Sequence, residues 1–142
     1  MEKSKKFSKI YLGITQGAVH TLLLLFILGI IANLYIEIPS DLASSATWAW
    51  VFSNSAIVVI HAILGMILLL VSIASLVLAF LSHHVQWIIA SILGLLFTGL
   101  AAYSGSDFIS NGQTNLSSLL MAFGFLGALV SYAVVVFHPQ KA

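Results

Sequence analysis

Two histidines lie well inside long apolar stretches of this sequence, and they are the residues best suited to chemistry. His20 follows Gly17-Ala18-Val19 and precedes a run of leucines, and His61 lies between Ile60 and Ala62. Ionisable side chains are costly in lipid and usually mark function there. A neutral imidazole nitrogen is an axial ligand of haem iron. These two positions therefore predict cofactor binding.

The spacing of the two histidines predicts similar depths. Thirteen residues separate His20 from Asn33, near the end of the first apolar stretch, and thirteen separate Trp48 from His61. At about 1.5 Å per residue, each histidine lies about 20 Å from that end. On antiparallel neighbouring helices the imidazoles are predicted to face each other and to hold one haem b between the first two helices.

Glycines accompany both histidines. Gly17 precedes His20 by three residues and Gly65 follows His61 by four, spacings that share one helix face. We therefore predict His20 and His61 as metal ligands and Gly17 and Gly65 as further cofactor-binding residues that make room for a flat macrocycle. The alternative for each histidine is a hydrogen bond across helices to Gln16, Asn54, a serine or a threonine.

The composition requires a lipid environment. Of 142 residues, 61% are hydrophobic and 6% are charged, whereas a soluble domain carries about 25% charged residues. A membrane helix needs about 20 mostly apolar residues. Four stretches qualify, and they predict one all-α integral membrane domain over 1–142, with helices at roughly 10–35, 48–81, 85–103 and 116–137.

The positive charges predict the orientation. All five are lysines, and none lies between the first and second stretches or between the third and fourth. Lysines favour the cytoplasmic side of a membrane. The sequence thus predicts a four-helix transmembrane up-down-up-down bundle, multi-pass in the lipid of the cell membrane, with both termini cytoplasmic. His83, His84 and His138 are then anchors at the cytoplasmic interface.

Small and polar residues recur at helical spacing on every span. Such stripes are typical of packing seams between membrane helices, so they predict the inward faces. They are Gly13 and Gly17 on the first span; Asn54, His61, Gly65 and Ser72 on the second; Ser91, either Gly94 or Leu95, and Thr98 on the third; and Ser117, Gly124, either Gly127 or Ala128, and Ser131 on the fourth.

Several classes of function are disfavoured. The chain has no cysteine and only five basic residues, which leaves no thiolate chemistry and no basic surface for nucleic acid. No phosphate-binding loop or hydrolase motif is present, so the chain is not expected to be an enzyme on its own. Asn115-Leu116-Ser117 matches a glycosylation acceptor, and the sequence leaves its modification open.

The helix number, the lysine cluster and the histidines on neighbouring spans resemble the small four-helix membrane cytochromes b and one half of the haem A synthase bundle. In motif, the resemblance covers His20 and the stretch His61-Ala62-Ile63-Leu64-Gly65. It implies a b-type haem-binding membrane subunit.

Two functions follow as hypotheses. The first is electron transfer through one bis-histidine haem, between a quinone or another haem and a partner. The second is a cofactor-free accessory or structural subunit that packs against other membrane protein subunits of a larger respiratory complex. A transporter or channel is less favoured, because no span holds the carboxylate or lysine that ion paths usually need.

Overall fold

The computed structural model describes residues 2–39 and 41–137. Within these ranges the chain forms five helices and no strand: α1 Glu2–Tyr35, α2 Ser44–Asn54, α3 Ala56–Ser82, α4 Val85–Ser110 and α5 Asn115–Phe137. Four of them hold segments long and apolar enough to cross a membrane: Lys6–Tyr35, Ala56–Ser82, Val85–Ser110 and Asn115–Phe137. The predicted all-α class with four candidate membrane helices is confirmed, and the fold is compatible with a multi-pass membrane protein.

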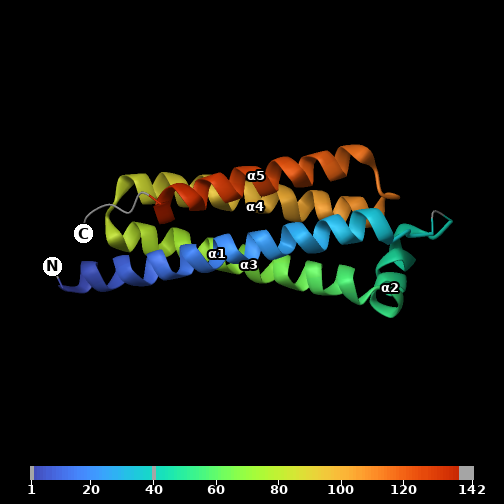
Figure 1. The fold of residues 1–142 in the computed structure, drawn as a ribbon, viewed down its shortest axis with the longest axis horizontal. Helices are drawn as coiled ribbons and strands as arrows, with labels where there is room; N and C mark the ends of the chain where they lie inside the picture. Colours follow the sequence, from blue (N-terminus) through green and yellow to red (C-terminus); the bar gives the residue numbers. More distant parts are fainter. Residues whose placement is uncertain (1, 40, 138–142) are drawn as a thin grey trace.

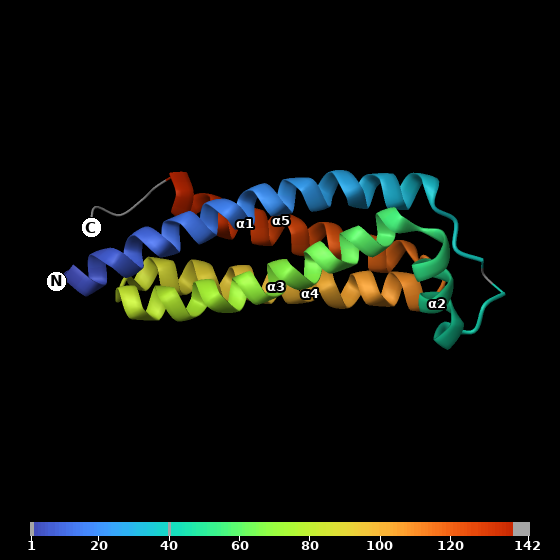
Figure 2. The same cartoon turned by 90° about the horizontal axis from the view of Figure 1, so that it is seen from below.

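The long helices lie side by side in one elongated bundle (Figures 1 and 2). The start of α1, the α3–α4 turn and the end of α5 lie at one end, and α2 and the α4–α5 loop lie at the other. The α3–α4 turn is tight because His83 adopts a left-handed conformation, with φ 59°, and its N–H donates to Phe80 O at 3.1 Å. This geometry ends α3.

The second predicted span is two helices in the structure. Ser55 leaves helical geometry, with φ −137° and ψ 87°, and its side chain accepts a hydrogen bond from Val58 N. A serine in this position caps the start of a helix, so α3 begins at Ala56 and α2 is separate. Asn54 therefore lies on α2, where its amide donates to Trp50 O at 2.8 Å, and it does not continue a stripe with His61.

The connection between α4 and α5 is shorter than the sequence predicts. The Gly- and Ser-rich segment after Tyr103 stays helical, and α4 ends at Ser110. Asp107 accepts hydrogen bonds from Asn111 Nδ2 at 2.7 Å and from Ser117 Oγ, which ties the end of α4 to the start of α5. The expected loop from Ser104 thus shrinks to the four residues after Ser110.

One glutamine joins the loops at this end of the bundle. The side chain of Gln113 accepts from Ile38 N at 3.0 Å and donates to Ile36 O at 2.8 Å. Both bonds satisfy main-chain groups in the segment between α1 and α2. The α4–α5 loop therefore holds the α1–α2 linker in place.

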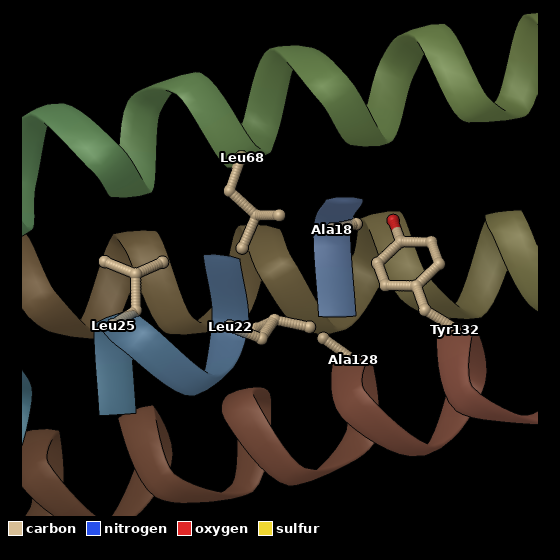
Figure 3. Packing of buried hydrophobic residues seen from close by; sticks show 6 residues of the cluster. All are labelled: Ala18, Leu22, Leu25, Leu68, Ala128 and Tyr132. Carbon is tan, nitrogen blue, oxygen red and sulfur yellow. The ribbon is translucent and has the colours of Figure 1, made fainter. Parts of the chain in front are cut away.

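Apolar side chains from three long helices meet in the middle of the bundle. Leu68 of α3 points toward Leu22 and Ala18 of α1, and Tyr132 and Ala128 of α5 close the same cluster (Figure 3). The residues are all buried. This cluster occupies the space between α1 and α3 at the depth where the sequence predicts a cofactor.

Polar and small residues form the seams between helices, as expected for α4 and α5. Tyr11 Oη lies 2.9 Å from Ser91 Oγ, which joins α1 to α4. A methyl group at Gly124 would lie 2.7 Å from both Phe97 O and Ala101 N, so glycine is needed for the close approach of α4 and α5. The predicted stripes on these two helices do face inward.

Candidate functional site

His20 lies on an exposed face of α1. Its Nδ1 is 2.8 Å from Gln16 O, one turn back along the same helix. A carbonyl oxygen only accepts, so Nδ1 carries the proton and Nε2 keeps its lone pair. A histidine held in this way presents Nε2 to an external donor or to a metal. The ring leans toward the start of α1, as helical side chains do.

His61 is half-buried against α1. A methyl group at Gly29 would lie 3.2 Å from His61 Cε1, and the main chain of Leu25 lies close to the ring. Nδ1 is buried and has no hydrogen-bond partner among the described residues. The imidazole therefore fills the space above a glycine and connects α3 to α1.

The structure does not bring the two imidazoles together. Leu25 and Gly29, which contact His61, lie five and nine residues beyond His20. At about 1.5 Å per residue this sets His61 roughly 7 to 14 Å further along α1, and the backward lean of His20 adds to the offset. The two axial nitrogens of a haem must meet at one iron, so this pair does not fit a shared haem within the chain.

The two glycines that were predicted to bind the cofactor beside the histidines, Gly17 and Gly65, are not packed against other residues. A methyl group at Gly17 or at Gly65 would meet nothing within 4 Å, and the same holds for Gly13. Gly13 and Gly17 are exposed, so their stripe points away from the bundle. The prediction that this stripe is an inward seam is wrong. The inward face of α1 is instead Ser8, Tyr11, Thr15 and Ala18.

The exposed stripe on α1 is polar as well as small. Gly13, Gln16, Gly17 and His20 are all exposed on one side of the helix, and we call this set the outer α1 face. His20 lies fourteen residues after Lys6 and fifteen before Tyr35, the ends of the membrane-crossing segment. The outer α1 face thus places polar groups near the middle of a candidate membrane span, and hydrocarbon would offer them no hydrogen bonds there.

Within the described residues, the other histidines are not grouped into a metal site. His83 is exposed at the α3–α4 turn. The ring centroids of His84 and Trp87 lie 4.3 Å apart. His138 lies outside the described residues. No group of three metal-ligating side chains occurs in the part of the chain that the structure describes. Two open hollows of about 220 and 210 Å³ lie at the α2 end, and neither is lined by a histidine.

The contact of His61 with Gly29 predicts a matched pair of stability effects. Gly29→Val forces the imidazole away from α1, and such overpacking costs about 1–3 kcal/mol. Gly65→Val adds the same side chain where no atom lies within 4 Å, so its effect should be small. Thermal unfolding in detergent checks this, and equal melting temperatures for the two variants would contradict the contact.

Comparison with protein-family models, with curated proteins and with solved structures finds no match to this chain.

Proposed function

We propose that this chain is a cofactor-free accessory or structural subunit of a larger membrane protein complex, and that the outer α1 face contacts protein there. The observation that carries the proposal is the exposure of Gln16 and His20 near the middle of the α1 span. A polar side chain that faces lipid tails is costly. Contact with another protein removes that cost by supplying hydrogen-bond partners.

The other exposed surfaces contrast with this face. Leu70 of α3, Leu96 of α4 and Leu126 of α5 are exposed to 61%, 64% and 53%. Such aliphatic side chains suit lipid, which is as apolar as leucine. The contrast distinguishes the outer α1 face as the side suited to protein. A respiratory complex is the setting proposed from the sequence, with other membrane subunits as partners.

Purification from the native membrane tests the proposed function. In mild detergent, an affinity-tagged chain should carry other membrane subunits at fixed molar ratios, measured by quantitative mass spectrometry. Recovery of the chain with only lipid would contradict the proposal.

We also propose that the four long helices cross the cell membrane in alternating directions with both termini cytoplasmic. Lys6 and Lys9 lie near the start of α1, at the end of the bundle that holds the α3–α4 turn. The acidic residues Glu37, Asp41 and Asp107 lie toward the opposite end, which holds α2. This charge distribution supports a cytoplasmic location for the lysine end.

Single-cysteine labelling checks the orientation, because the chain has no cysteine of its own. An impermeant maleimide should label Ser45→Cys in intact cells and should label His83→Cys only after permeabilisation. Labelling of both positions from the same side would contradict alternating crossings.

One observation favours a second candidate, a b-type haem subunit for electron transfer. The bond between His20 Nδ1 and Gln16 O leaves Nε2 free on an open face, as in histidines that ligate metals. His20 would supply one axial ligand at a subunit boundary, the second ligand would come from a partner, and a quinone or another haem would exchange electrons with it. When bound, haem supplies one-electron redox chemistry.

A reduced-minus-oxidised optical spectrum of the native complex decides between the two candidates. The haem candidate predicts a b-type spectrum that His20→Ala abolishes and His61→Ala preserves. The cofactor-free candidate predicts a flat spectrum, before and after addition of haem. A spectrum lost in both variants would instead restore the histidine pair predicted from the sequence.

A further inference from the structure

We propose that two copies of this chain associate through the outer α1 face, with the two α1 helices parallel and crossing at Gly13 and Gly17. The inference rests on the proposed function and names one partner, a second copy. It is carried by two independent features of that face: the open space over the glycines and the complementary hydrogen-bonding groups of Gln16 and His20.

The open space permits close contact between helices. Gly13 and Gly17 are four residues apart, and nothing lies within 4 Å of a methyl group built on either. The Gly17 carbonyl accepts from Thr21 Oγ1 at 3.0 Å, so that hydroxyl is satisfied within the helix. Without side chains at the crossing point, two backbones can approach closely and gain van der Waals contact.

The polar groups on this face complement a second copy of themselves. His20 Nε2 is an acceptor, because Nδ1 donates to Gln16 O. The Gln16 side chain, with no hydrogen-bond partner among the residues described, has two N–H donors and an acceptor oxygen. The His20 ring lies back over Gln16, so both groups occupy one depth. In a parallel pair, Gln16 of one copy can donate to His20 Nε2 of the other.

In a two-fold symmetric pair the same hydrogen bond forms twice. Two copies inserted in the same orientation have parallel α1 helices, and a two-fold axis along the membrane normal brings identical depths together. Each copy then donates one such bond and accepts one. Lys6 and Lys9 are exposed beyond Gly13, and a crossing of about 40° separates these like charges at the bilayer surface.

Energy transfer between labelled chains in lipid vesicles tests the proposal. Ser45→Cys, exposed on α2, carries donor or acceptor dye in the otherwise cysteine-free full chain, and the protein-to-lipid ratio is varied. The unaltered face should give transfer that fits two copies. Gly17→Ile or Gln16→Leu should raise the protein-to-lipid ratio needed for association by about tenfold. Gly99→Ile should leave it unchanged.

Circular dichroism and thermal melting verify that each variant is folded. Transfer no greater than random proximity at every ratio would overturn the proposal. Transfer that survives both Gly17→Ile and Gln16→Leu would also overturn it, because association would then use another face.

Failure of the dimer and failure of the proposed function give different results. Loss of self-association with other subunits still copurifying at fixed ratios would reject the second copy and keep the accessory subunit. Self-association in vesicles, combined with no other subunit copurifying from the native membrane, would keep the dimer and reject membership of a larger complex.

Discussion

In the hydrocarbon layer a polar group must find its hydrogen-bond partner within protein, and this constraint shapes the whole bundle. Some hydroxyls meet it within their own helix, as when Thr15 Oγ1 donates to Tyr11 O at 2.8 Å. Others meet it between helices, as when Tyr11 contacts Ser91 and Ser72 Oγ lies 3.4 Å from Thr98 Oγ1. These bonds lie among tightly packed small residues, and together they determine which face of each helix points inward.

The number of long helices and their apolar character could be predicted from composition, because about 20 consecutive apolar residues are typical of a membrane-spanning helix. Their ends could not. Ser55 interrupts an apolar run by capping a new helix, and Asp107 extends α4 by binding the start of α5. Both effects depend on a few side-chain hydrogen bonds, which cannot be read from average hydropathy.

The candidate site was harder to predict for a related reason. α1 carries two stripes of small and polar residues, one of Ser8, Tyr11, Thr15 and Ala18 and the other on the outer α1 face. Periodicity alone cannot say which stripe is buried by the rest of the chain. Tyr11 favours the first stripe, because its hydroxyl is paired with Ser91 and its ring stacks on Trp87. His20 is thereby turned away from His61, which packs on Gly29 instead.

The function that we propose depends on which face of α1 is buried. Many polar side chains are hydrogen-bonded within the bundle, whereas Gln16 and His20 are exposed near the middle of α1, so this face is suited to contact with another protein. The most direct measurement is photocrosslinking in the native membrane from a photoreactive residue at position 20, with position 96 as the lipid-facing reference. The account predicts a protein adduct of defined mass at position 20 and lipid adducts at position 96. Lipid adducts alone at both positions would contradict it.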